Sequence, residues 1–207
     1  MMTDMNFGGV EMVVMNYYRH IDRSKVQFDF FALEGSAVPQ KDEIEQLGGK
    51  VYIVPKVSDL PQYEKEIIRI FRQNQYKIVH SHMNTLSVFS LWGAEKAGVP
   101  NRIAHNHSTA GKGETKKNVM KYALRPFAKI YPTELCACSR YAGEWLYGKN
   151  AEFRVFNNAI DLTRYILVMV LLTQSMDVYL ILVVILIAIS FMVQLFKGRR
   201  VRIVIHR

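Results

Sequence analysis

Short apolar segments with strand character alternate with amphipathic segments at helical spacing over residues 1–165. Successive strands separated by a helix can pair in parallel, because the helix carries the chain back across a face of the sheet. The alternation therefore predicts an α/β fold, a Rossmann-like three-layer parallel sheet with helices on both faces. The expected strands are residues 26–33, 50–55, 76–82, 101–107, 134–139 and 153–161, and the expected helices are residues 9–21, 41–48, 60–75, 85–98, 116–131 and 140–148.

Four of the six histidines of the chain form two pairs, each with one residue between its members. His80 and His82 end one expected strand, and His105 and His107 end the next. Side chains alternate along a strand, so the members of each pair point to the same side. Because ligands of open α/β sheets bind at the carboxyl ends of the strands, the sequence predicts a functional site there.

Charge and cysteine content exclude several classes of protein. The formal net charge is +9, but the basic residues are scattered and are not interleaved with aromatic residues, so no nucleic-acid partner is expected. Cys136 and Cys138 are too close on one strand to form a comfortable disulfide, which favours a reducing compartment. The first residues show no signal-peptide pattern, and a cytoplasmic location is expected.

The composition changes abruptly at Ile166, where a hydrophobic tail over residues 166–207 begins. Residues 178–196 are nearly all apolar and as a helix would extend about 28 Å, close to the ~30 Å core of a bilayer. The sequence thus predicts a helical tail with a possible transmembrane helix, which could attach the chain to the inner face of the cytoplasmic membrane. The basic residues after it favour a cytoplasmic C-terminus, which would leave the preceding domain outside without a signal. A native tail, a frameshift product and a true anchor all remain open, as does the orientation.

Several segments in their order along the chain resemble a known family. "MNFGGVE", "KIVHSHMN", "RIAHNHST", "CACSRYAGEWLYG" and "FRVFNNAID" are similar to the N-terminal half of retaining GT-B glycosyltransferases of family 4, of the bacterial exopolysaccharide and capsule type. The resemblance covers about residues 5–165, which would be the acceptor-side domain. It implies transfer of a sugar from a nucleotide-sugar donor to a polysaccharide or lipid-linked acceptor, without a metal or other cofactor.

The resemblance also assigns roles to individual residues. Gly8 and Gly9 would form a loop that lets a phosphate or sugar approach the backbone at a helix start. The catalytic histidine would be His107, with His105 as the alternative. Further substrate-binding residues would be Glu11, His80, His82, Asn106, Ser108 and Thr109.

The chain departs from the family pattern at both ends. The hydrophobic strand that opens the family's fold looks clipped, since only "MMTD" precedes the first matching segment. No glutamate follows Glu152, whereas the family's donor-binding domain carries a pair of them. A truncated glycosyltransferase, inactive by itself, is therefore expected. One alternative is a membrane-anchored interaction module without chemistry; a weaker one is a zinc-binding protein, for which the two histidine pairs and two cysteines would offer ligands.

Overall fold

The computed structural model describes residues 1–3, 5, 9–111 and 113–158. All of them lie within one compact unit, Met1–Ile160. The tail expected at residues 166–207 and its transmembrane helix at 178–196 lie outside the described residues. Within the described part of the chain, no helix combines the length and the apolar character needed to cross a bilayer.

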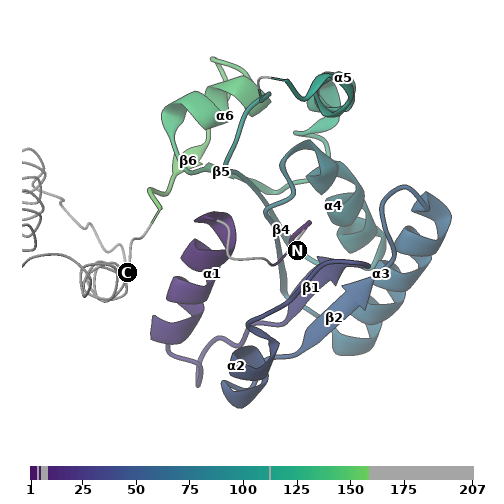
Figure 1. The fold of residues 1–207 in the computed structure, drawn as a ribbon, viewed down its shortest axis with the longest axis vertical. Helices are drawn as coiled ribbons and strands as arrows, with labels where there is room; N and C mark the ends of the chain where they lie inside the picture. Colours follow the sequence, from purple (N-terminus) through teal and green to yellow (C-terminus); the bar gives the residue numbers. More distant parts are fainter. Residues whose placement is uncertain (4, 6–8, 112, 159–207) are drawn as a thin grey trace, which may run out of the picture. The chain divides into compact units, whose positions relative to one another are not determined.

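Strands and helices alternate along the described chain (Figure 1). The α/β prediction is confirmed, and every helix expected before residue 150 is present. The helices are α1 Gly9–His20, α2 Lys41–Gln46, α3 Leu60–Asn74, α4 Ser87–Lys96, α5 Thr115–Leu124 and α6 Arg140–Tyr147. The strands are β1 Phe30–Leu33, β2 Val51–Val54, β3 Ile78–Ser81, β4 Asn101–Asn106, β5 Glu134–Ala137 and β6 Arg154–Val155. Short 3-10 turns, η1 Asn84–Leu86 and η2 Arg125–Phe127, precede α4 and follow α5.

All the strand pairs are parallel, but the strands form two ladders where the sequence predicted one sheet. β1 pairs with β2, and the other ladder runs β3-β4-β5-β6. Met1 and Met2 lie between the two ladders. The Met1 amine donates to the His80 carbonyl at 2.8 Å, and the His82 amide donates to the Met1 carbonyl at 3.0 Å. On the other side the Met2 amide donates to the Phe31 carbonyl at 2.9 Å, so these two residues join the ladders.

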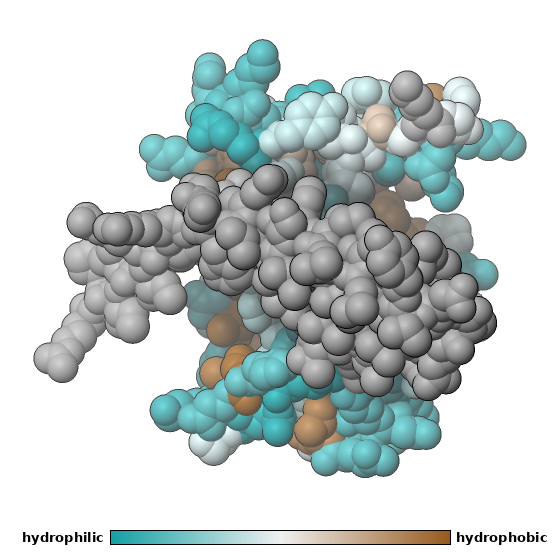
Figure 2. Space-filling view, turned by 60° about the vertical axis from the view of Figure 1, so that its left-hand side comes forward, coloured by the Kyte–Doolittle hydropathy of each residue, from teal (hydrophilic) through white to brown (hydrophobic). Residues whose placement is uncertain are grey.

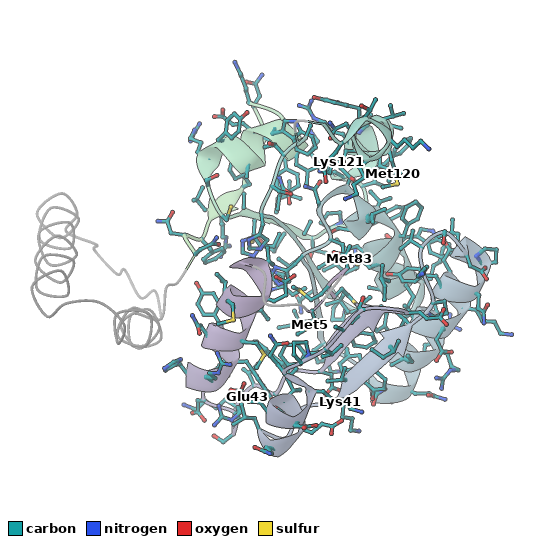
Figure 3. The ribbon with its side chains drawn as sticks, viewed as in Figure 1. Met5, Lys41, Glu43, Met83, Met120 and Lys121 are labelled. Atoms are coloured by element: carbon teal, nitrogen blue, oxygen red, sulfur yellow. The ribbon has the colours of Figure 1, made fainter. Side chains whose placement is uncertain are left out.

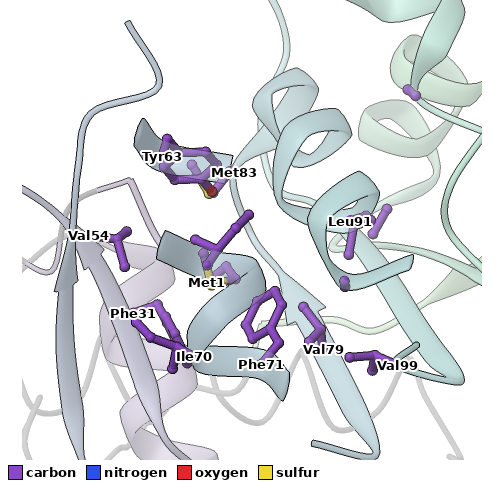
Figure 4. Packing of buried hydrophobic residues seen from close by; sticks show 14 of the residues in the cluster. Met1, Phe31, Val54, Tyr63, Ile70, Phe71, Val79, Met83, Leu91 and Val99 are labelled. Carbon is purple, nitrogen blue, oxygen red and sulfur yellow. The ribbon is translucent and has the colours of Figure 1, made fainter. Parts of the chain in front are cut away.

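Helices cover both faces of β1, as two neighbouring phenylalanines show. Phe30 packs with Tyr18 and Ile44, which come from α1 and α2. Phe31 points to the opposite face, because side chains alternate along a strand, and it packs with Phe71 of α3 in the larger core (Figure 4). Burial of each such ring contributes about 1.5–3 kcal/mol. The three layers follow from this alternation.

β1 is shorter than the strand expected at residues 26–33, and side-chain hydrogen bonds explain why. The Asp29 carboxylate accepts from the Lys50 amide at 2.9 Å, in a place where a longer β1 would offer a backbone carbonyl. The same carboxylate accepts from the Tyr76 hydroxyl. Pairing through the backbone therefore starts only at Phe30, whose amide donates to the Lys50 carbonyl at 2.7 Å.

Individual residues explain where helices α3 and α5 begin or end. Asp59 caps α3, its carboxylate accepting from the Gln62 amide at 3.4 Å, and Gln75 ends that helix in the left-handed conformation, with φ +50°. The helix expected at residues 116–131 ends earlier, because α5 gives way to a 3-10 turn that contains Pro126. Most of the described surface seen in Figure 2 is hydrophilic, with scattered apolar residues.

α6 is fastened to the sheet by one buried hydroxyl. The Tyr147 hydroxyl donates to the carbonyls of Ala104 and Cys136, at 2.9 and 3.0 Å, on the neighbouring strands β4 and β5. We expect Tyr147→Phe to lower the free energy of unfolding by about 1 kcal/mol, because the ring still packs but the hydrogen bonds are lost. Urea unfolding measures the difference, with Tyr141→Phe as the matched control, since Tyr141 is 73% exposed. Equal losses in the two variants would contradict this role of the hydroxyl.

Candidate functional site

The register of β3 and β4 brings the two histidine pairs together. The strands are parallel, with His80 opposite Ile103 and Ser81 opposite Ala104. His82 follows the end of β3, and His105 lies near the end of β4. This register puts His82 level with His105, and both pairs lie at the carboxyl edge of the ladder, as the sequence predicted.

The four side chains form one group, here called the histidine cluster: His80, His82, His105 and His107. His80 Nε2 lies 3.1 Å from His105 Nδ1, and His82 Nδ1 lies 2.9 Å from His107 Nε2. Within each strand the two rings are also close, with centroids 4.2 Å apart for His80 and His82 and for His105 and His107. The rings of His80 and His82 stack, those of His105 and His107 are tilted, and each pair hydrogen-bonds to the other.

The backbone under the cluster is fixed on both sides. Met1 bonds to the backbone of His80 and His82, as described above. On the other side, the Cys138 amide donates to the Asn106 carbonyl at 2.9 Å and continues the ladder past the end of β5. The rings are therefore carried on a frame with little freedom to shift.

Burial keeps the cluster neutral. It lowers the pKa of His80 and of His105 to about 3 each and lowers the pKa of His82 well below its usual value. Neighbouring histidines lower these pKa values further, and the buried Met1 amine does so for His80 and His82. Burial also lowers the pKa of His107, partly offset by a side-chain hydrogen bond with Asn158. At pH 7 the cluster is a set of imidazoles that can each donate and accept one hydrogen bond.

Two ring nitrogens of the cluster, His105 Nε2 and His107 Nδ1, are buried and make no hydrogen bond of ordinary length among the described residues. His105 is only 6% exposed. Leaving such an atom unpaired costs about 1–3 kcal/mol. His107 lies beyond the strand end and is half-buried, so it is more accessible than His105.

A family model for glycosyltransferase family 4 matches residues 7–164, which include α1 through β6 and the histidine cluster. The chain belongs to glycosyltransferase family 4. EpsF of Bacillus subtilis (strain 168), which is named as a glycosyltransferase, is 34% identical over 170 residues. That match covers 78% of this chain but only 44% of EpsF, so the chain spans less than half the length of this relative. No solved structure matches the chain significantly.

The family resemblance also pointed to the residues after His107, and the structure ties this segment to the loop after β3. Asn84 Nδ2 donates to the carbonyl and to the hydroxyl of Ser108, both at 2.9 Å. Asn84 holds this position in a left-handed conformation, with φ +52°. Sequence analysis made no prediction for Asn84. The available signal was its residue type just after a histidine pair, because asparagine tolerates a left-handed conformation.

Thr109 belongs to the same loop and contacts α5. Its carbonyl accepts from the Lys121 ammonium at 3.0 Å. Lys121, which is labelled on α5 in Figure 3, also forms an ion pair with Glu114 at 3.5 Å. Ser108 is exposed and Thr109 is half-buried. Both residues therefore border the accessible side of the cluster, and their contact with a substrate stays a prediction.

Asn106 has a different place from the one expected. Its side chain is fully buried and donates from Nδ2 to the Ala142 carbonyl of α6 at 2.7 Å. Alternation along β4 sends it to the face opposite His105 and His107. Asn106 thus holds a helix against the sheet and is not available to bind a substrate.

The glycine loop is described only in part. Gly8 lies outside the described residues, whereas Gly9 begins α1 and has open space where a Cβ would be. Glu11 lies in the first turn of that helix and is half-buried. A site shared by this loop and His107 stays a prediction.

The cysteines do not join the cluster. Cys136 is buried, Cys138 is half-buried, and both are free thiols. The Cys138 thiol lies 3.5 Å from the His107 carbonyl rather than from a ring. Within the described ranges, the one group of side chains that could hold a metal ion consists of His80, His82 and His105. The two thiols therefore do not belong to the group that could hold a metal among the described residues, and the zinc-binding alternative itself stays a prediction.

The neutrality of the cluster makes stability depend on pH. Unfolded histidines take up protons near pH 6.5, whereas folded His80 and His105 stay neutral down to about pH 3. The unfolded state then binds more protons between these values, so the free energy of unfolding falls as the pH is lowered from 7 to 4. We expect His105→Gln to reduce this slope by about 1.4 kcal/mol per pH unit, the value for one group. Urea unfolding at several pH values measures it.

The control variant for this pH experiment is His20→Gln, because His20 lies on α1, outside the histidine cluster. If His105→Gln and His20→Gln showed the same pH dependence, the neutral burial of the cluster would be refuted.

Proposed function

We propose that residues 1–158 form the acceptor-side domain of a bacterial glycosyltransferase that builds exopolysaccharide or capsule. The reaction is the transfer of a sugar from a nucleotide-sugar donor to a polysaccharide or lipid-linked acceptor. Family membership supports the reaction class. The observation that carries the site is the histidine cluster, rigidly held at the edge where such sheets bind ligands.

His107 is the proposed catalytic residue. It lies past the end of β4, is half-buried, and is oriented through its Nε2 by the neutral His82. A neutral imidazole in this position can hydrogen-bond a sugar hydroxyl or a phosphate oxygen without the cost of burying a charge. His105 is 6% exposed and suits the supporting layer behind it better than direct contact with substrate.

Donor binding is proposed to need a second domain. The described residues supply one wall of a cleft, and the reaction requires donor and acceptor to be held in one geometry while the leaving diphosphate is stabilised. Each of these effects is worth several kcal/mol of activation free energy, so their loss should abolish turnover.

We expect the purified 207-residue chain to release no nucleoside diphosphate above background from a panel of nucleotide sugars, with or without lipid-linked acceptor. A coupled assay for nucleoside diphosphate measures this. Clear release that His107→Ala abolishes would show that this chain is a complete catalyst.

A chimera tests whether this domain supports sugar transfer when the rest of a glycosyltransferase is present. Residues 1–158 would replace the matching part of EpsF, to which this chain is 34% identical over 170 residues. We expect the chimera to transfer sugar wherever EpsF itself does under the same assay, and His107→Ala to lower kcat by about 100-fold, as for the loss of one positioned hydrogen-bonding group. His20→Ala serves as control. A folded chimera whose rate is unchanged by His107→Ala would refute the role of His107.

A further inference from the structure

We propose that α5 and the 3-10 turn after it bind the surface of a lipid bilayer that contains anionic lipids. The contact is made by the exposed side of residues 115–130, here called the α5 surface. It does not include the histidine cluster, and the contact does not rest on the proposed sugar transfer.

α5 carries its apolar side chains on the outside. None of its ten residues is buried, whereas each of the other described α-helices buries at least one residue. Isolated apolar residues are ordinary on a protein surface, but a group of them marks an interaction site. The apolar side chains of the α5 surface, each 43–66% exposed, are Val119, Met120, Tyr122, Phe127 and Ile130.

The polar side chains of α5 that face the domain hold the helix in this orientation. Asn118 Nδ2 donates to the Gly111 carbonyl at 2.7 Å, and the Lys121 ammonium donates to the Thr109 carbonyl at 3.0 Å. Lys121 and its exposed neighbour Met120 are both labelled in Figure 3. A surface helix usually has its apolar side against the core and its polar side in water. Because α5 has the opposite arrangement, its apolar side is available to a partner.

The charge of the α5 surface indicates which partner it fits. Lys116, Lys117 and Lys129 are exposed beside the apolar side chains. Glu114 is the one acidic residue between residues 113 and 133, and it already pairs with Lys117 at 3.0 Å and with Lys121 at 3.5 Å. Helices that lie in the interface of a bilayer combine apolar side chains, which enter the acyl region, with lysines, whose ammonium groups stay among anionic headgroups.

A second copy of this chain fits the α5 surface less well. Two such surfaces in contact would bring their lysines together, and like charges across an interface oppose association. A stable protein interface also takes about 800 Å² from each partner, which is more than one short helix usually supplies. A bilayer needs neither a complementary shape nor a large area, so the observations favour it.

The α5 surface lies beside the loop that follows the histidine cluster. This loop carries Ser108 and Thr109, and Lys121 of α5 bonds to the Thr109 carbonyl. A bilayer bound at α5 would therefore bring lipid-linked acceptors close to this loop. That consequence rests on the proposed function, whereas the membrane contact does not.

Brominated lipids measure insertion at one position of the chain. Bromine on the acyl chains quenches the fluorescence of a tryptophan that enters the acyl region. We expect vesicles of phosphatidylglycerol and phosphatidylcholine to quench Val119→Trp in the purified 207-residue chain, above the background of the natural Trp92 and Trp145. Val26→Trp is the matched control and should not be quenched, because Val26 is 41% exposed but lies outside the α5 surface.

Neutral lysine variants test the requirement for anionic lipid. In the Val119→Trp chain, Lys116→Gln with Lys117→Gln should lower the equilibrium constant for insertion, read from the quenching, by about 25-fold, or about fivefold for each lysine near the surface. The control pair is Lys50→Gln with Lys77→Gln, because these lysines are exposed elsewhere on the domain. Far-UV circular dichroism checks that each variant is folded.

Three results would overturn the proposal. They are equal quenching of Val119→Trp and Val26→Trp, equal quenching by vesicles of phosphatidylcholine alone, and equal effects of the two lysine pairs. Absence of quenching at position 119 would assign the α5 surface to a protein partner instead. Membrane binding through residues 178–196 alone does not place position 119 in the acyl region, so it does not imitate the expected result. No sugar transfer is measured, so the outcome is independent of the proposed function.

Discussion

Parallel pairing of β3 with β4 is the constraint on which the site depends. Each strand carries its histidine pair on one side, but the pairs meet only because Ser81 is level with Ala104. A shift of one residue in this register would send one pair to the opposite face. The surrounding core, with α3 and α4 packed against the strands, stabilises this register, and Met1 fixes it from the neighbouring position.

The cluster lowers the stability of the domain that holds it. Four neutral imidazoles occupy space that apolar side chains could fill, and two of their nitrogens, His105 Nε2 and His107 Nδ1, are buried without a hydrogen bond of ordinary length among the described residues. Proteins keep such a local loss of folding stability mainly at functional sites, where binding a ligand compensates for it. The proposed sugar transfer needs His107 at the accessible rim of the cluster.

Family membership gives the cluster its setting. The family 4 match covers residues 7–164, which include α1 through β6, and EpsF is more than twice as long as the aligned segment. The described domain is rigid at its carboxyl edge, where Asn84 ties the loop after β3 to Ser108. Such a preorganised wall is what a cleft between two domains requires, because a displacement of a positioned group by about 1 Å can lower the rate 100-fold.

The sequence by itself determined the order of strands and helices, the α/β class and the placement of both histidine pairs at strand ends. These depend on local periodicity, which the chain carries in every segment. The alternation of side chains along a strand also indicates that Asn106 points away from His105 and His107, whereas the family resemblance placed Asn106 among the substrate-binding residues. Tertiary structure decided the rest. Several features depend on contacts between residues far apart in the chain. They are the start of β1 only after Asp29, the hydrogen bonds between the histidine rings, and the bridge from Asn84 to Ser108. The position of Cys136 and Cys138 outside the cluster was likewise decided by the tertiary structure. Their geometry depends on the register between strands, which no local pattern encodes.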